Sequence, residues 1–206
     1  MKKLFLCSFF KDVAGFLPQF AGGELAGKSV AFIPTACVPE KVNFFVKSGK
    51  KALEKLGLVV DELELTTTAP DLIAAKLRQS DLIYITGGNT FFLLQELRRC
   101  GADKIIAEQI AAGKPYIGES AGAMVVAPDI DYAKGYDDCT KAPDLSDYAA
   151  LGIVDFYPCP HYTEQPFKKA VEKIIAKYEA QLALKPITNS QAILVSGSDV
   201  SVCGVE

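Results

Sequence analysis

Short apolar runs alternate with segments in which apolar residues recur every three or four positions. Runs of four to eight apolar residues are typical of strands buried on both faces, and the three-to-four spacing is typical of amphipathic helices. The pattern predicts strands at residues 4–9, 29–33, 58–65, 81–86 and 115–117, and helices at about residues 39–56, 68–79, 91–99, 103–112 and 121–127. This alternation favours an α/β fold, a three-layer sandwich in which helices cover both faces of a mostly parallel central sheet.

The pattern loosens after residue 127. Residues 129–150 are polar and rich in Asp, Lys and Tyr, and this segment is long for a simple connection, so we expect a functional loop. A long amphipathic helix is predicted at about residues 167–178, followed by a hairpin at residues 192–195 and 200–203. A length of 206 residues suits one domain, and we expect residues 1–206 to form a single α/β domain.

A glycine–x–serine–x–glycine pentapeptide, Gly118 to Gly122, stands between the fifth predicted strand and a run of small apolar residues that begins a helix. A strand, a tight turn and a helix form the context in which a serine nucleophile is held on an elbow. The backbone of the serine is strained there, so glycine is needed two residues away on either side. The motif therefore indicates Ser120 as a nucleophile, with an ordinary glycine-rich turn as the alternative.

A serine nucleophile needs a base with a pKa near neutrality, and His161 is the one histidine in the sequence. We interpret it as the general base. A third member would be a carboxylate that orients the imidazole. Asp137 and Asp138 lie between Ser120 and His161, which gives the order serine, acid, histidine of nucleophile-elbow enzymes. We expect Asp138 to take this role, with Asp137 second and Glu164 third.

A second glycine motif, Gly87-Gly88-Asn89, ends the fourth predicted strand. Ligands of parallel α/β sheets bind at the carboxyl ends of the strands, so this motif and Ser120 should meet in space. The N–H groups of Gly88 and Ala121 could together form an oxyanion hole, with Gly87 and Asn89 beside the substrate. A phosphate-binding loop is the alternative, but neither standard glycine-rich nucleotide motif is present.

Composition narrows the choice of function. The net charge is −3 and the pI is near 5.3, which argues against general binding to nucleic acid or to anionic membranes. Six scattered cysteines without paired spacing are expected to be free thiols in a reducing cytoplasm, and a first strand is the better interpretation of the apolar N-terminus than a signal peptide. With one histidine and no cysteine cluster, we expect no metal site and no cofactor.

Three motifs occur in one order along the chain: Ile85-Thr86-Gly87-Gly88-Asn89-Thr90, then Gly118-Glu119-Ser120-Ala121-Gly122-Ala123, then Pro160-His161-Tyr162. Together they resemble the dipeptidase E family of serine peptidases, with cyanophycinase as a more distant relative. The resemblance runs through nearly the whole chain. It implies a fold like that of class I glutamine amidotransferases, with serine where those enzymes use cysteine, and it implies the same nucleophile, base and oxyanion hole.

Two features depart from that family. Its aspartyl dipeptidases have an acid near position 135, where this chain has Gly135, so Asp137 or Asp138 would have to take its place. The chain also ends soon after the predicted hairpin, and residues that would contact an N-terminal aspartate are expected to be missing. The resemblance therefore does not carry the family's substrate over to this chain.

The leading interpretation is a cytoplasmic serine exopeptidase, monomeric or homodimeric, that hydrolyses short peptides through Ser120 and His161. An esterase or amidase with the same triad is a second possibility, and a panel of esters and dipeptides would separate the two. A non-catalytic binding protein on the same fold is a third, which a covalent adduct on Ser120 would exclude.

Overall fold

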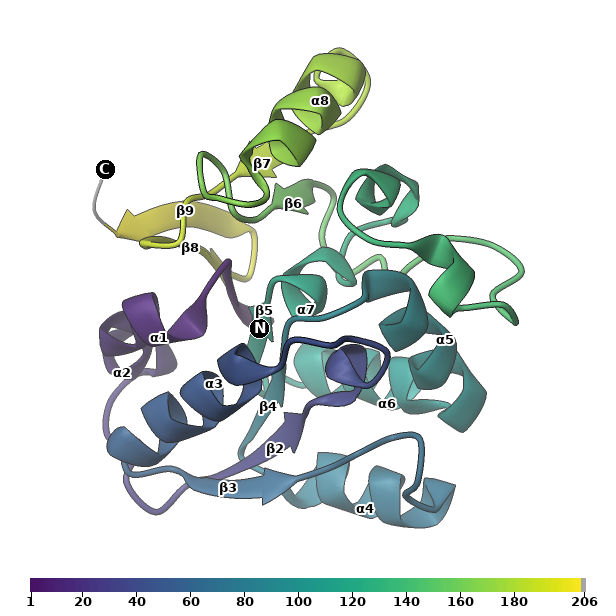
Figure 1. Ribbon diagram of the computed structural model, residues 1–206. Helices are drawn as coiled ribbons and strands as arrows, with labels where there is room; N and C mark the ends of the chain where they lie inside the picture. The colour runs from purple at the N-terminus through teal and green to yellow at the C-terminus, as the bar shows by residue number, and fades with distance from the viewer. Residues whose placement is uncertain (205–206) are drawn as a thin grey trace.

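A seven-stranded sheet forms the centre of the molecule (Figure 1), as the computed structural model of residues 1–204 describes it. The strand order is β3-β2-β4-β5-β1-β8-β9. The first five strands of this order are parallel, and β8 and β9 are added antiparallel at one edge. A separate pair, β6 and β7, is parallel. Because β5 lies between β4 and β1, the segment after it starts at the middle of the sheet.

The strands are β1 Lys3–Cys7, β2 Ser29–Ile33, β3 Val59–Glu62, β4 Leu82–Ile85, β5 Tyr116–Glu119, β6 Tyr157–Cys159, β7 Leu184–Pro186, β8 Gln191–Ser196 and β9 Asp199–Gly204. The α-helices are α1 Phe10–Val13, α2 Leu17–Ala21, α3 Phe44–Lys55, α4 Pro70–Gln79, α5 Thr90–Cys100, α6 Ala102–Ala111, α7 Ala121–Met124 and α8 Lys168–Tyr178. Four 3₁₀ turns are η1 Ala14–Phe16, η2 Thr35–Cys37, η3 Asp131–Gly135 and η4 Cys139–Lys141.

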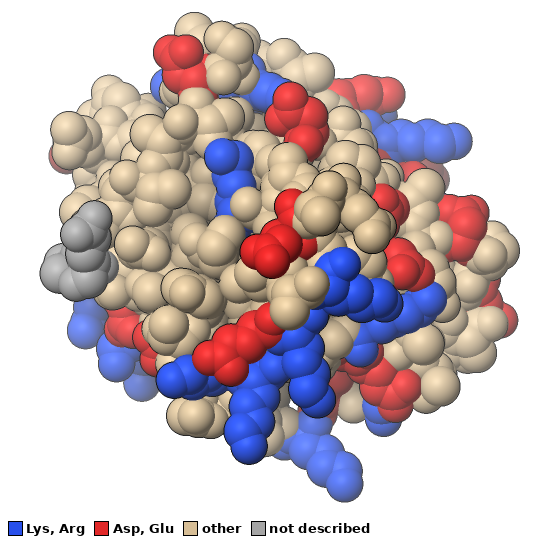
Figure 2. Space-filling model, turned by 90° about the horizontal axis from the view of Figure 1, so that it is seen from above, with Lys and Arg blue, Asp and Glu red and all other residues tan. Residues whose placement is uncertain are grey.

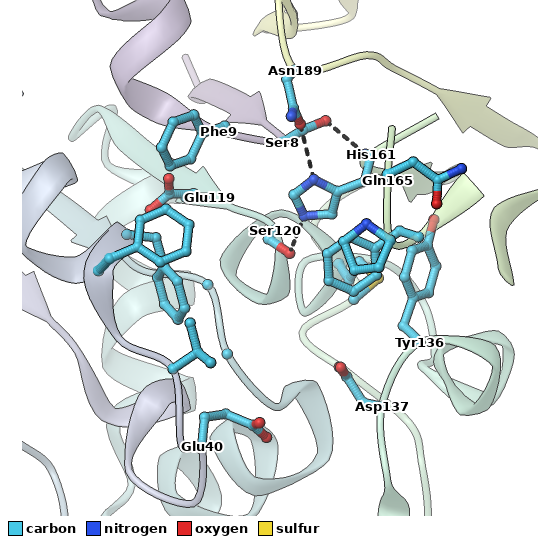
Figure 3. A pocket seen from close by; sticks show the side chains of 18 of the residues that line it. Ser8, Phe9, Glu40, Glu119, Ser120, Tyr136, Asp137, His161, Gln165 and Asn189 are labelled. Carbon is cyan, nitrogen blue, oxygen red and sulfur yellow. Dashed lines mark hydrogen bonds between the residues drawn. The ribbon is translucent and has the colours of Figure 1, made fainter. Parts of the chain in front are cut away.

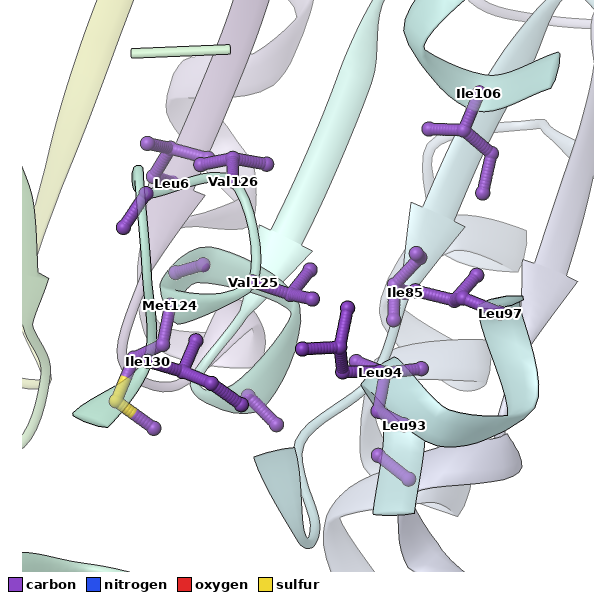
Figure 4. Close-up of a cluster of buried hydrophobic side chains, with 14 of the residues drawn as sticks. Leu6, Ile85, Leu93, Leu94, Leu97, Ile106, Met124, Val125, Val126 and Ile130 are labelled. Atoms are coloured by element: carbon purple, nitrogen blue, oxygen red, sulfur yellow. The ribbon is translucent and has the colours of Figure 1, made fainter. Parts of the chain in front are cut away.

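Alternate residues of the central strands enter two different cores, because successive side chains of a strand point to opposite faces. In β1, Leu4 and Leu6 join the core beneath α4, α5, α6 and α7, whereas Phe5 and Cys7 join the core beneath α1, α2 and α3. Figure 4 shows part of the first core, where side chains of α5, α6 and α7 meet those of β1 and β4. Both faces of the sheet are therefore covered, which explains the unbroken apolar runs in the sequence.

The predicted fold class is confirmed: a mostly parallel sheet lies between two helical layers, the serine elbow follows a central strand, and a hairpin closes the described chain. Most predicted elements agree with the structure to within a few residues. The segment between the first and second predicted strands, for which no element was predicted, contains α1, η1 and α2. Strands β6 and β7 were not predicted, because three-residue strands carry too few positions to show a pattern.

Three features of the structure concern the expected membrane, thiol and nucleic-acid chemistry. None of the helices within residues 1–204 is long and apolar enough to cross a membrane. All six cysteines are unpaired. Seen from above, acidic side chains lie among the basic ones (Figure 2), so this face is not the uniformly basic surface typical of nucleic-acid binding.

Candidate active site

Ser120 lies on a strained turn between β5 and α7. Its φ and ψ are 50° and −105°, in a region that residues with a Cβ rarely adopt. A Cβ on Gly118 would overlap the carbonyl of Gly122, and a Cβ on Gly122 would overlap the carbonyl of Ile85. The two glycines of the motif are therefore required by close backbone packing, and the turn is held by the N–H of Ser120, which donates to Cys7 O at 2.8 Å.

His161 and Ser120 meet above this turn (Figure 3). The distance from His161 Nε2 to Ser120 Oγ is 3.0 Å, and on the other side of the ring His161 Nδ1 lies 2.9 Å from Asn189 Oδ1. An amide oxygen can only accept, so the neutral tautomer that satisfies both contacts carries its proton on Nδ1. Nε2 is then free to accept the Ser120 hydroxyl proton, which is the arrangement a general base needs.

Ser8 and Phe167 hold His161 in place. Its backbone N–H donates to Ser8 Oγ at 2.9 Å, and the Ser8 hydroxyl donates to Ile187 O at 3.1 Å. The Phe167 ring stacks on the imidazole with centroids 4.5 Å apart. Burial lowers the pKa of His161 below its ordinary 6.5, against the opposing effects of the Asn189 hydrogen bond and Glu164. The imidazole is therefore neutral at pH 7 and able to accept a proton.

The predicted orienting acids lie elsewhere in the structure. Asp137 Oδ2 accepts from the N–H and hydroxyl of Thr90, at 2.9 and 2.6 Å, and Asp138 Oδ1 accepts from the N–H and hydroxyl of Thr140, at 2.9 and 2.7 Å. Glu164 precedes α8, and its backbone N–H donates to the carbonyl of His161. Asn189 occupies the place expected for a carboxylate, which differs from the prediction. The order serine, acid, histidine predicts a carboxylate between Ser120 and His161, whereas Asn189 is an amide that follows β7.

The Gly87-Gly88-Asn89 loop passes next to the serine elbow, as expected from the topology. A Cβ on Gly87 would lie 3.2 Å from that of Ser120. Gly88 has a φ of +135°, and a Cβ there would overlap the backbone of Ala36, so only glycine fits. The side chain of Asn89 is buried, accepts from the N–H of Phe92 at 3.0 Å and donates to Asp138 O at 3.0 Å. Asn89 therefore caps α5 and fixes the loop, and its side chain does not face the substrate as expected.

Glu119, next to the serine, is almost completely buried. Oε1 accepts from the N–H of Phe10 at 2.9 Å and Oε2 from the hydroxyl of Tyr84 at 2.7 Å. Burial raises the pKa of this carboxyl to about 7, although these donors and the backbone of Gly87 favour the ionised form. Glu119 thus joins the elbow to the loops that follow β1 and β4.

We expect Glu119→Gln to remove a pH dependence of stability. A carboxyl whose pKa rises from 4.5 to about 7 on folding stabilises the protein fully below pH 4.5, and this contribution is lost as the pH rises through 7. Its size is roughly 3 kcal/mol. Urea unfolding should show that the free energy of unfolding of the wild type falls by this amount between pH 4.5 and 8, relative to that of Glu119→Gln. Glu54→Gln, at an exposed position of α3, should show the same pH dependence of stability as the wild type. Parallel pH curves for wild type and Glu119→Gln would contradict the assignment.

A cavity of about 600 Å³ opens over the Ser120–His161 pair. Its walls come from the loops after β1, β2 and β4, from residues 136–141 and from the His161 loop. The hydroxyl of Tyr136 donates to Pro160 O at 2.9 Å and so links the long polar segment to the His161 loop. The expectation that residues 129–150 form more than a connection agrees with their place at the cavity.

Two residues of this site were missed in the sequence, Ser8 and Asn189. Ser8 follows β1 directly, and it could have been found by listing every polar residue at the carboxyl end of a predicted strand. Asn189 stands in the Thr188-Asn189-Ser190 turn before β8, where nothing in the local pattern distinguishes it from a hairpin turn residue. Its proximity to His161 depends on how the chain folds back after α8.

Comparisons with known proteins point to one peptidase family. The model of peptidase family S51 matches residues 4–203. An uncharacterized peptidase of Listeria innocua, Lin0382, is 56% identical over 97% of this chain and 95% of its own length. Peptidase E of Nostoc sp. is 31% identical over 71% of this chain and 57% of its own length. A crystal structure of a Listeria monocytogenes EGD-e protein described as a candidate peptidase E superposes with a TM-score of 0.96, at 51% identity and full coverage of both chains.

The family match covers all three motifs and nearly every described residue. It confirms the resemblance to the dipeptidase E family that those motifs indicated. Serine-type hydrolysis follows from membership of this family. The chain therefore belongs to peptidase family S51 and is a serine-type peptidase.

Proposed function

We propose that this peptidase hydrolyses short peptides with Ser120 as nucleophile, His161 as general base and Asn189 as the residue that orients the imidazole. The observation that carries the proposal is the 3.0 Å contact between Ser120 Oγ and His161 Nε2, made on a strained elbow while Asn189 holds the opposite ring nitrogen. A neutral amide can fix the tautomer but adds no negative charge to stabilise an imidazolium. This arrangement therefore orients the base without raising its pKa as much as a carboxylate would.

In the proposed reaction, Ser120 Oγ attacks the peptide carbonyl carbon while its proton passes to His161 Nε2. The N–H groups of Gly88 and Ala121 stabilise the resulting oxyanion. When this tetrahedral intermediate collapses, the C–N bond breaks and the imidazolium protonates the leaving amine. Water, deprotonated by His161, then hydrolyses the acyl-enzyme. Support for the oxyanion hole comes from Ala121, whose N–H starts α7 without an intrahelical acceptor, and from the obligate glycine at position 88.

Short peptides are the proposed substrates because the cavity is enclosed by loops on several sides. Its volume of about 600 Å³ is typical of small-ligand sites rather than of an extended groove for a polypeptide. A dipeptide, a tripeptide, a decapeptide and a p-nitrophenyl ester should be compared, with products identified by mass spectrometry. We expect kcat/KM to be highest for the shortest peptides, with no activity in Ser120→Ala. Hydrolysis of the ester alone, or a preference for the decapeptide, would contradict the proposal.

Substitutions of Asn189 should distinguish the orientation of the His161 imidazole from the effect of a negative charge beside it. Asn189→Ala removes the acceptor for Nδ1–H and is expected to lower kcat about 100-fold, less than the roughly 10⁴-fold that loss of an orienting carboxylate costs. Asn189→Asp retains the acceptor and adds a charge, so it should raise the pKa of His161 and move the acidic limb of the kcat/KM profile to higher pH. An unchanged pH profile in Asn189→Asp would show that this residue does not act on the imidazole.

A further inference from the structure

The cavity beside Ser120 has two unlike ends, and neither is used by the nucleophile or the base. One end is aromatic and is lined by Phe9, Val42, Phe44 and Phe45. The rings of Phe9 and Phe44 are 6.2 Å apart and those of Phe44 and Phe45 are 5.9 Å apart, so they form a continuous surface. Phe44 is 64% exposed and Val42 58% exposed. A contiguous patch of exposed large apolar side chains beside an active-site cavity is typical of a ligand-binding surface.

The other end is acidic. Asp137 and Glu40 both line the cavity, and Figure 3 shows them on the same side of it, below the Ser120–His161 pair. Asp137 Oδ2 is held by two hydrogen bonds from Thr90, which fixes the carboxylate in place. Its second oxygen, Oδ1, makes no hydrogen bond to any residue within 1–204. A fixed, half-buried carboxylate with one free oxygen is suited to accept hydrogen bonds from a cation.

The charges around the cavity favour a cationic group over an anionic one. Asp137, Asp138 and Glu40 line it, and Lys141 is the one cation among the described lining residues. Asp138 is exposed, so solvent screens its charge, whereas Asp137 is half-buried and lies with Glu40 on one side of the cavity. A substrate carboxylate would meet an excess of negative charge there, whereas an ammonium would find a partner.

We propose, resting on the serine peptidase function above, that the substrate is a short peptide with a free amino terminus and an apolar side chain. The α-ammonium binds Asp137, with Glu40 adding negative charge, and the side chain packs on Phe9, Phe44 and Phe45. In such a peptide the ammonium nitrogen and the first side-chain carbon are both attached to Cα, so each lies two bonds from the carbonyl carbon that Ser120 attacks. Both ends of one cavity can therefore be occupied by a single residue.

The side-chain part is tested with dipeptides that differ only in the first residue: Phe, Leu, Ala, Lys and Asp. We expect kcat/KM for Phe and Leu to exceed that for Asp at least about 100-fold, because the aromatic surface gains apolar contact and the acidic end repels a carboxylate. Phe44→Ala should raise KM for the Phe substrate and leave the Ala substrate unchanged. A wild-type preference for Asp or Lys as the first residue would overturn this part. So would a Phe44→Ala variant that lost kcat/KM equally on the Phe and Ala substrates.

The ammonium part is tested with the Leu dipeptide and its N-acetyl derivative. Wild type should prefer the free amine by roughly 10- to 100-fold, the effect of one charge-assisted hydrogen bond. Asp137→Asn can keep both Thr90 contacts through its amide oxygen and would present N–H donors to the cavity. This variant should lose activity on the free amine alone, through KM. If Asp137 had only a structural role, Asp137→Asn would lower kcat/KM equally for both substrates, and that result would overturn the assignment.

Asp138→Asn is the matched control, since it removes the same charge from the next residue, whose side chain is exposed and bonds to Thr140. It should change the ratio of kcat/KM for the free amine to kcat/KM for the N-acetyl derivative by less than about threefold. Hydrolysis that depends on Ser120 but favours Asp or acetylated peptides would overturn this inference and leave the proposed function standing. No Ser120-dependent hydrolysis of any peptide in the panel would overturn both.

Discussion

Ser120→Ala is expected to lower kcat for peptide hydrolysis by about a million-fold, to the level left by substrate binding and the oxyanion donors. The hydroxyl is the attacking group, and no other group in the cavity can replace it in the acyl transfer. The fold should persist, because alanine keeps the Cβ and the Ser120 hydroxyl bonds only to His161 among residues 1–204. Single-turnover kinetics on a dipeptide would measure the loss, and the thermal midpoint should change little.

Ser8→Ala serves as the control for Ser120→Ala, because it removes a hydroxyl from the same cavity. Ser8 acts only through the backbone of His161 and the carbonyl of Ile187. Its removal should therefore lower kcat on the order of tenfold. A Ser120→Ala protein that kept a hundredth of wild-type turnover would show that the nucleophile had been misassigned.

His161→Gln is expected to lower kcat about as much, since nucleophile and base act as one unit. The glutamine could still hydrogen-bond to Ser120, but it cannot take up a proton near neutral pH. The pH profile gives a second measurement. Burial lowers the pKa of His161 below 6.5, so wild-type kcat/KM should hold at pH 6.5 and fall only under more acidic conditions.

The acidic limb can be assigned directly because the chain has one histidine. The imidazole C–H signals in a proton NMR titration then belong to His161, and their midpoint should coincide with the kinetic limb. Asp137 could add a second transition, because burial and the charge of Glu40 raise its pKa to about 6. Repeating the profile in Asp137→Asn removes that contribution. A His161 midpoint above 6.5 would contradict the buried, neutral base.

The features that could be predicted from the sequence depend on local chemistry. Strands buried on both faces appear as apolar runs, and the elbow appears as a serine between two glycines because close packing excludes any Cβ there. The order of strands and helices was enough to place Gly88 near Ser120, since the carboxyl ends of neighbouring parallel strands meet. His161 could be chosen because no other histidine competes for the role.

The features that were missed depend on long-range folding. Asn189 reaches His161 only because the chain after α8 returns along β7, pairs with β6 and then enters β8 beside β1. Asp138 was predicted to orient His161, with Asp137 second, but position along the chain does not determine where a side chain points. The two carboxylates bond to Thr140 and Thr90 instead. The triad pattern also predicts a carboxylate at this place, so it gives no signal for a neutral amide.

The most direct test of the central claim is covalent labelling with a fluorophosphonate followed by peptide mapping. The account predicts one adduct per chain, on Ser120, with labelling strongly slowed in His161→Gln and absent in Ser120→Ala. Glu119→Gln should still label, because Glu119 faces Phe10 and Tyr84 rather than the Ser120 hydroxyl. An adduct on any other residue, or labelling that survives in Ser120→Ala, would contradict the account.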